Sequence, residues 1–226
     1  MGRLSTRFDV SLLHFDGQNG GTTFADESGK VWTPHASAAL STTQAKFGAT
    51  SGYFPGNSYI STPQSSDFDF GNGDFTVDGW IFPTALGESA YSLIWGKGAY
   101  QIAIVQINGS YAIKGLLSTN GSSWNLANLV ALGTATQNAW NHFAFSRVGS
   151  NVYGLLGGVL GSTTSVGTSS VYAASATINI GGNGSANSYV TGYLDEIRAL
   201  KGKGLYNGAF TPPTRPYRMP VTSILH

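Results

Sequence analysis

Six Asn-Gly dipeptides divide this chain into short segments and constrain its fold more than any other feature. Asn-Gly supplies the positive φ angles of two-residue hairpin loops, so we expect several of these dipeptides to join antiparallel strands. The segments between them have strand character and show no convincing helical period, which predicts an all-β fold of two packed antiparallel sheets. The dipeptides are Asn19-Gly20, Asn72-Gly73, Asn108-Gly109, Asn120-Gly121, Asn183-Gly184 and Asn207-Gly208. The predicted strands are Phe75–Phe82, Tyr100–Ile107, Tyr111–Ser118, Trp140–Val148, Asn151–Leu156, Ala176–Ile180 and Tyr193–Leu200.

The composition fits one well-packed domain and excludes several classes of function. The chain has 226 residues, of which 41% are hydrophobic and 10% are charged, and all-β sandwiches of about this size are commonly single domains. A formal net charge of +1 gives no strong field to attract nucleic acid. We see no apolar run long enough to cross a bilayer. We therefore expect neither nucleic-acid binding nor membrane insertion.

The predicted strand Tyr193–Leu200 contains an unusual residue. Strict alternation would place Tyr193, Asp195 and Ile197 on one face and Leu194 and Glu196 on the other. A lone carboxylate on a buried face is costly unless it is hydrogen-bonded, ion-paired or bound to metal. Asp195 is therefore the first candidate for a site.

Four segments of the sequence carry a family resemblance. SLLHFDGQNGGTTFADESG (Ser11–Gly29), AKFGATSGYFPG (Ala45–Gly56), DFDFGNGDFTVDGWIFP (Asp67–Pro83) and the run Ser188–Tyr217 resemble the laminin-G-like branch of the concanavalin A-like jelly rolls. Similar versions occur in structural proteins of tailed bacteriophages. The resemblance implies a two-sheet antiparallel jelly-roll sandwich over residues 11–217, preceded by an N-terminal arm (1–10) and followed by a C-terminal tail (218–226).

One hairpin departs from the family pattern. Where relatives carry a Tyr-x-Asn-Gly turn, this chain has Gly157-Gly158, which can make the same turn. The stretch Gly157–Ser170 is rich in Gly, Ser and Thr, so we expect a mobile loop or an irregular sheet edge there.

The resemblance implies a calcium site. In the family a metal often joins the N-terminal strand or the loop after it to the carboxylate of the strand that matches GYLDE, and the matching positions here are Asp16 and Asp195. Asp26 is a further candidate ligand. Calcium prefers carboxylate and carbonyl oxygens, which suits these loops. The alternative for Asp195 is that it accepts backbone N–H bonds or pairs with a cation.

Aromatic residues are the candidates for glycan contact. Trp124 lies in a polar stretch directly after an Asn-Gly turn, and Trp32 and Tyr91 are weaker candidates. For each of them the alternative is core packing, which is common for large rings in a sandwich. Trp80 and Trp140 lie in alternating segments, and we expect both in the core.

The sequence does not favour catalysis. Jelly-roll glucanases display an acid and a nucleophile about 5–5.5 Å apart, on alternate positions of one strand. No predicted strand has such a pair, and Asp195 and Glu196 are adjacent, so they are expected on opposite faces. The four histidines are not spaced like zinc ligands. We expect no enzymatic activity.

The first functional hypothesis is a non-catalytic virion component, assembled in the host cytoplasm and located on a capsid or tail. Its N- and C-terminal arms would dock on other virion subunits, it would form a homo-oligomer, and its loops could hold host-surface glycans. The absence of cysteine suits a reducing compartment. The second hypothesis is a free-standing, secreted, calcium-dependent carbohydrate-binding module. A glycoside hydrolase is the third and least favoured.

Overall fold

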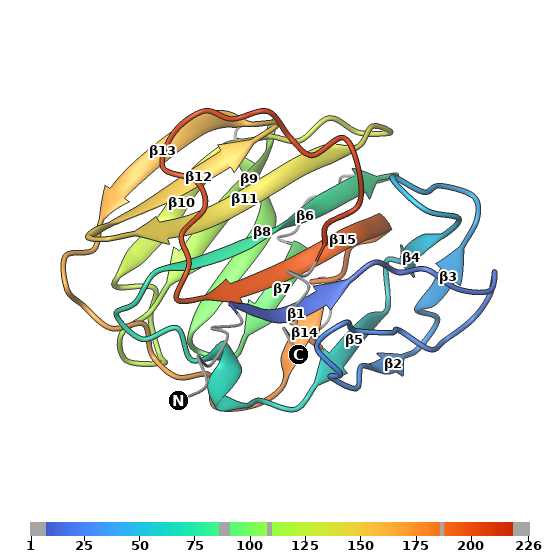
Figure 1. Cartoon of the computed structure of the whole chain (residues 1–226), viewed down its shortest axis with the longest axis horizontal. Coiled ribbons are helices and arrows are strands. Elements are labelled where there is room, and N and C mark those ends of the chain that lie inside the picture. Colours follow the sequence, from blue (N-terminus) through green and yellow to red (C-terminus); the bar gives the residue numbers. More distant parts are fainter. Residues whose placement is uncertain (1–7, 86–90, 108–109, 186–187, 219–226) are drawn as a thin grey trace, which may run out of the picture.

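The computed structural model describes residues 8–85, 91–107, 110–185 and 188–218. Two antiparallel sheets pack face to face, as predicted (Figure 1). In these residues the eight-stranded sheet runs β13 (Val159–Ser165), β12 (Asn151–Leu156), β11 (Asn141–Val148), β6 (Phe75–Pro83), β15 (Thr191–Lys201), β4 (Ser51–Pro55) and β3 (Ala39–Ser41), and β1 (Asp9–Leu13) also pairs with β15. The seven-stranded sheet runs β10 (Ala127–Thr134), β9 (Ser110–Leu117), β8 (Tyr100–Ile107), β7 (Tyr91–Gly96), β14 (Ile178–Ile180), β5 (Tyr59–Thr62) and β2 (Thr33–His35).

The core lies between the sheets. Alternating residues of both sheets point inward, and burying a large apolar side chain stabilises the fold by about 1.5–3 kcal/mol. The core cluster includes Phe54, Ile81 and Phe143 from the eight-stranded sheet and Ile60, Leu93 and Ile113 from the seven-stranded sheet. Each sheet therefore has a second, outer face that is turned away from its partner.

Several local predictions can be compared with the strands. Gly157-Gly158 does join β12 to β13. The stretch Gly157–Ser170, predicted as a mobile loop or an irregular edge, contains β13, an edge strand with one register shift against β12, which confirms the irregular edge. At the N-terminus β1 begins at Asp9, two residues inside the predicted arm. Residues 1–7 and 219–226 lie outside the described residues, so the rest of both terminal segments stays a prediction.

Strand β15 contains a bulge that the sequence pattern does not reveal. The pairing with β6 moves from Asp195↔Trp80 to Arg198↔Asp78, so Glu196 and Ile197 both lie opposite Gly79. Glu196 has a φ of +52°, and a side-chain carbon on Gly79 would press on Ile197 and on the Glu196 carbonyl. The bulge therefore needs glycine at position 79, and it resets the alternation of side chains along the strand.

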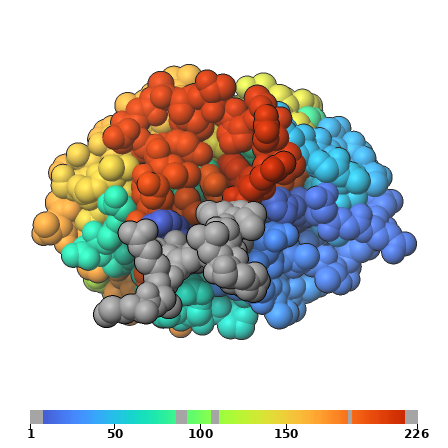
Figure 2. All heavy atoms as spheres, in the orientation of Figure 1, coloured from blue at the N-terminus to red at the C-terminus, as the bar shows by residue number. Residues whose placement is uncertain are grey.

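A long C-terminal segment covers the outer face of the eight-stranded sheet. We call residues 202–218 the strap. Figure 1 shows it in red across the front of β15, β6 and β11, and Figure 2 shows that its atoms form much of the surface of this face. Its backbone is anchored where Gly202 N donates to Asp74 O and Phe210 N donates to Gly158 O. Among the described residues, the strap also bonds to Asp78 on β6 and Glu196 on β15, both in the eight-stranded sheet.

Candidate functional site

Beneath the strap lies a buried ion pair that joins two central strands. The guanidinium of Arg198 on β15 donates to both oxygens of Asp78 on β6, at 3.0 Å from Nε and 2.7 Å from Nη2. The hydroxyl of Tyr206, a strap residue, donates to Asp78 Oδ2 at 3.0 Å. Such a bidentate, fully paired arrangement is needed because an uncompensated buried charge is strongly destabilising. The strap therefore adds a third hydrogen bond to the Asp78 carboxylate, beside the two from Arg198.

Glu196 is the second anchor of the strap. Its Oε2 accepts a hydrogen bond from Tyr217 N at 2.7 Å, and its Oε1 lies 2.7 Å from Nδ1 of His14. The hydrogen bond to Glu196 raises the pKa of His14. The Tyr217 ring stacks under the Arg198 guanidinium at 3.9 Å, and its hydroxyl lies 2.8 Å from Nε2 of His142. The contacts of Glu196 hold it in its left-handed backbone conformation, which is costly for a non-glycine residue.

Asp195 lies on the outer face, so the expectation that it shares the face of Ile197 is wrong. The bulge at Glu196 turns Ile197 into the core, while Asp195 pairs across the ladder with outward-facing Trp80. Asp195 Oδ2 accepts backbone N–H bonds from Lys46 at 2.8 Å and Phe47 at 3.2 Å. Its Oδ1 is buried and has no partner among the described residues. Burial raises the pKa of Asp195 to about 7.

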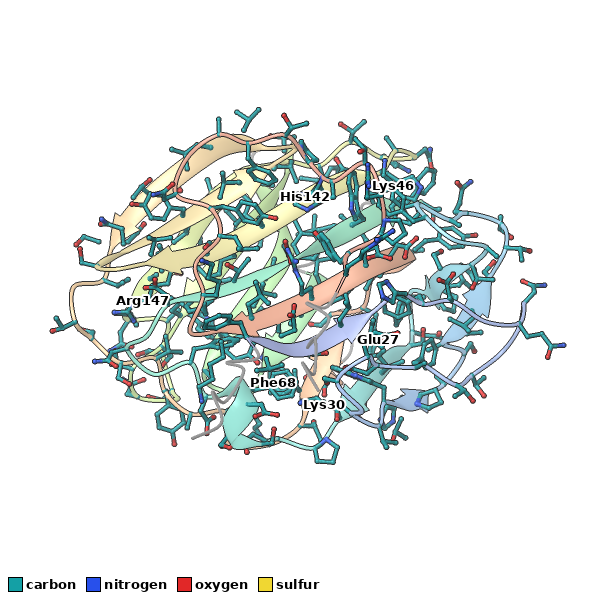
Figure 3. The ribbon with its side chains drawn as sticks, viewed as in Figure 1. Glu27, Lys30, Lys46, Phe68, His142 and Arg147 are labelled. Atoms are coloured by element: carbon teal, nitrogen blue, oxygen red, sulfur yellow. The ribbon has the colours of Figure 1, made fainter. Side chains whose placement is uncertain are left out.

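Trp80 also lies on the outer face of its sheet, contrary to the prediction that it lies in the core. Trp80 is buried, but beneath Lys46 rather than in the core between the sheets: Lys46 Nζ lies 4.0 Å from its ring centre. His142 on β11 packs edge-to-face on the other side, with ring centres 4.9 Å apart, and burial lowers the pKa of His142 to about 4. Figure 3 labels Lys46 and His142 on this covered face. Asp195, Trp80 and His142 thus form one row across β15, β6 and β11.

The two adjacent carboxylates of the covered face are buried beneath other parts of the chain. Asp195 and Glu196 lie on the same side of the sheet, contrary to the expectation of opposite faces, but only 0% and 1% of their surfaces are exposed. The backbone of residues 46 and 47 bonds to Asp195, and the strap bonds to Glu196 through Tyr217 N. Glycoside hydrolysis needs two carboxylates that flank a bond of the bound sugar. The burial and the backbone hydrogen bonds of Asp195 and Glu196 therefore favour a structural role for both carboxylates.

The three predicted calcium ligands lie in different surroundings. Asp16 is exposed and its Oδ1 accepts from Ala49 N at 3.3 Å, so Asp16 and Asp195 hold one loop at its two ends. Asp26 accepts four hydrogen bonds, including 2.6 Å from Ser11 Oγ and 2.9 Å from Trp32 Nε1, which favours a structural role for it. Within the described ranges, no group of three or more His, Cys, Asp or Glu residues is placed to hold a metal. Calcium binding stays a prediction.

Trp124 is the predicted glycan residue that the structure places beside a pocket. The pocket has a volume of about 150 Å3 and lies where the β9–β10 loop meets the β7–β8 turn. Its lining residues are Gly98, Ser118, Gly121, Ser122, Ser123 and Trp124. The Trp124 ring is half-buried, and Ser122 and Ser123 are exposed. Rings and hydroxyls side by side are the groups that bind sugars, because a pyranose presents apolar C–H faces and polar edges.

Asn120 makes the Trp124 pocket rigid. Its Oδ1 accepts hydrogen bonds from the backbone N–H groups of Ser122 at 3.0 Å and Ser123 at 3.1 Å. Gly121 has a φ of +78°, and a side-chain carbon there would collide with the ring of Tyr172. Tyr172 is 38% exposed, and its backbone N–H donates to Ser118 O. The Asn-Gly turn seen in the sequence thus forms the pocket wall, whereas the approach of Gly98 and Tyr172 had no sequence signal.

The sequence also singled out Trp32 and Tyr91 for glycan contact and Trp140 for the core. Trp32 is 4% exposed, belongs to the core cluster and donates to Asp26, which contradicts the expectation that it contacts a glycan. Tyr91 begins β7, but its side chain lies outside the described part of the structure. Trp140 is half-buried against Phe82, edge-to-face at 5.6 Å, so its predicted place in the core is wrong.

Comparisons with solved structures find the same fold at low sequence identity. Domain 4 of AbnA, a GH43 extracellular arabinanase from Geobacillus stearothermophilus, in complex with arabinotriose, matches with a TM-score of 0.63 and 18% identity, over 92% of this chain and 96% of that domain. The binding domain of Paraclostridial Mosquitocidal Protein 1 matches with a TM-score of 0.61 and 13% identity, over 88% of this chain and 50% of that one. Botulinum neurotoxin type C, whose cell entry depends on two ganglioside molecules, matches with a TM-score of 0.62 and 13% identity.

The match to botulinum neurotoxin type C covers 88% of this chain and 49% of the neurotoxin chain. This chain therefore spans nearly all of the arabinanase domain but about half of each toxin chain. These identities establish the fold alone. No curated protein matches the sequence. Among the described residues, none of the helical structure has the length and apolarity to span a bilayer.

A family model gives the assignment. The model Laminin_G_3, described as the concanavalin A-like lectin/glucanases superfamily, matches residues 54–211. This range runs from the end of β4 into the strap, so it includes most strands of both sheets, the Trp124 pocket and the ion pair under the strap. By this match over more than half of its length and by its two-sheet jelly roll, the chain belongs to the Laminin_G_3 family of concanavalin A-like domains.

Proposed function

We propose that this protein is a non-catalytic carbohydrate-binding domain and that its ligand contacts the Trp124 pocket. The observation that carries the proposal is the pocket of about 150 Å3 beside a half-buried Trp, with exposed serine hydroxyls at its rim. Its six lining residues include no Asp or Glu, so they do not supply the carboxylate pair that glycoside hydrolysis uses. The arabinotriose complex of the arabinanase domain and the ganglioside dependence of the neurotoxin support sugar binding by this fold.

A glycan array that includes arabinotriose tests the proposal. We expect the wild-type protein to bind at least one glycan, and Trp124→Ala to weaken that binding roughly tenfold or more, as removal of an aromatic anchor commonly does. Trp140→Ala is the matched control, because Trp140 is also half-buried but packs on Phe82, a residue of the eight-stranded sheet. A blank array, or equal binding by the Trp124 variant, would count against the proposal.

The finer role, attachment to a virion, remains a proposal that comes from the resemblance to tailed-phage structural proteins. In that role many copies on one particle would turn weak sugar contacts into strong attachment through avidity. The strap supports it indirectly, since its Tyr206 and Tyr217 are tied to carboxylates of the eight-stranded sheet. The Trp124 pocket would then remain free for a glycan.

A further inference from the structure

The outer face of the seven-stranded sheet carries a row of ring and amide side chains. Trp95 on β7 pairs with Gln101 on β8 and with Asn179 on β14, and Asn179 in turn pairs with Ser61 on β5. Directly opposed residues point to the same face, with Cβ atoms about 4.5–5.5 Å apart. The core neighbours of these residues, Ile94 and Ile178, point inward. The row therefore lies on the outer face of the seven-stranded sheet, where Asn179 and Ser61 are buried and Trp95 and Gln101 are partly exposed.

Asn179 is the unusual member of the row. It is 3% exposed, yet its Oδ1 has no hydrogen-bond partner among the described residues. A buried amide oxygen without a partner costs about 1–3 kcal/mol, so such a group needs an explanation. Its Nδ2 would lie 4.0 Å from a side-chain carbon on Gly184, and Tyr59 Oη would lie 3.6 Å from the same carbon. Two polar groups thus converge beside Gly184.

The other polar groups of the row are held in fixed orientations. Gln101 Nε2 donates to Ser92 Oγ at 2.6 Å, which orients the amide while Gln101 remains partly exposed. Trp95 between the two amides is half-buried, so part of its ring meets solvent. A fixed ring flanked by fixed amides loses little conformational entropy when a ligand binds.

A column of rings borders the row. His35 stacks on Tyr59 with ring centres 4.1 Å apart and an interplanar angle of 6°, and Tyr59 lies 6.1 Å from Tyr189 at 23°. His35 Nε2 lies 2.8 Å from Ser61 Oγ, which ties the column to the row. All three rings are partly exposed. The column forms a rigid aromatic edge on the side of β5 and β2.

We propose that this surface, the Trp95 platform, is a second carbohydrate contact site that takes a neutral sugar chain. Trp95 would stack on the apolar face of one sugar ring, and the partly exposed Gln101 amide would bond to its hydroxyls, while buried Asn179 lies beside the site. The ligand is neutral because the row offers rings, amides and a hydroxyl but no charge. The proposal rests on the proposed function and adds a site that is separate from the Trp124 pocket.

The test compares Trp95→Ala, Gln101→Ala, Trp124→Ala and the control Trp140→Ala on one array of neutral and acidic oligosaccharides. We expect Trp95→Ala to lose roughly tenfold or more in binding of a neutral oligosaccharide, while Trp140→Ala keeps it. If Trp95→Ala fails to fold, two other measurements test the platform. Gln101→Ala should weaken binding of the neutral oligosaccharide, and that oligosaccharide should shift the indole N–H signal of Trp95 in NMR spectra of the wild-type protein.

The outcomes separate the two proposals. Wild-type binding that Trp95→Ala and Gln101→Ala leave unchanged overturns the platform, whether or not Trp124→Ala weakens it. Loss in Trp95→Ala with full binding in Trp124→Ala supports the platform and overturns the Trp124 pocket. Binding of acidic glycans alone overturns the neutral ligand class, and a blank array overturns both sites.

Discussion

Asp195 and His142 lie in one buried row, and burial moves their pKa values in opposite directions. The pKa of Asp195 rises from 3.8 to about 7, so the folded protein holds an extra proton there and the contribution of Asp195 to the free energy of unfolding falls as pH rises from about 4 to about 7. The pKa of His142 falls from 6.5 to about 4, so its contribution is lost as pH drops from about 6.5 to about 4. The two effects oppose each other in the wild-type protein.

Single substitutions should reveal these opposed slopes. We expect the free energy of unfolding of Asp195→Asn, relative to wild type, to increase from pH 4 to pH 7, by up to about 1.4 kcal/mol per pH unit. Asn keeps an oxygen to accept from Lys46 and Phe47. For His142→Gln the relative free energy should instead increase as pH falls toward 4. Urea unfolding at four pH values measures both, and curves that run parallel to wild type would refute the assignment.

At the scale of single residues, the sequence indicated Asp195 as unusual but gave the wrong reason. Alternation placed Asp195 on the core face, whereas the bulge at Glu196 puts it on the outer face. The bulge depends on contacts of Gly79 with Glu196 and Ile197, which lie far from it along the chain, so a period-2 pattern cannot reveal it. Trp95 was missed for a related reason. Its partners Gln101 and Asn179 are known only from the strand register.

At the scale of elements, the β12–β13 turn is built to receive the strap. Gly157 and Gly158 both have positive φ, at +58° and +80°. A side-chain carbon on Gly158 would collide with the Phe210 carbonyl of the strap, whereas one on Gly157 would meet nothing within 4 Å. The two glycines therefore form a matched pair: both tolerate the turn, but only one contacts the strap.

This pair gives a direct test of how the strap is held. Gly157→Ala should cost about 1–2 kcal/mol, the strain of a left-handed non-glycine residue. Gly158→Ala should cost about 1–3 kcal/mol more, because its methyl group displaces the strap. Tryptic cleavage after Lys203 should be faster in Gly158→Ala than in Gly157→Ala. Equal stability and equal cleavage would show that the strap does not depend on this contact.

The strands themselves were largely predictable, and the strap was not. Tyr100–Ile107 and Asn151–Leu156 were predicted with the bounds that the structure gives them, because turn residues mark their ends clearly. The strap has no periodicity, since it is held by the Tyr206 hydroxyl, which donates to Asp78, and by the Tyr217 ring, which packs on Arg198. Trp80 was placed in the core because its alternating strand gave no sign that the outer face is covered too.

At the scale of the whole molecule, the two faces of the sandwich differ. The strap closes the outer face of the eight-stranded sheet, and the Trp95 row leaves polar and aromatic groups on that of the seven-stranded sheet. A particle-bound role would use terminal residues for docking and leave the sugar-binding groups turned outward. The two-layer architecture was predictable, whereas the cover over the eight-stranded sheet depended on the course of the strap.

The assembly proposal can be tested on the intact protein. If the protein is a virion component, we expect light scattering after size exclusion to show an oligomer, and the protein to sediment with purified phage particles. The low net charge of +1 would allow copies to pack without strong mutual repulsion. A monodisperse monomer that never sediments with particles would refute this role and leave the carbohydrate-binding proposal intact.

The position of Tyr217 has a consequence for synthesis on the ribosome. Glu196 is made some twenty residues before the backbone group that caps it, and Asp78 is made well before Tyr206. Until the strap leaves the exit tunnel, water must solvate these carboxylates, so the outer face of the eight-stranded sheet stays hydrated in the nascent chain. Completion of the native state therefore waits until residue 217 leaves the exit tunnel, and a ribosome stalled shortly before residue 217 should hold an incompletely folded chain.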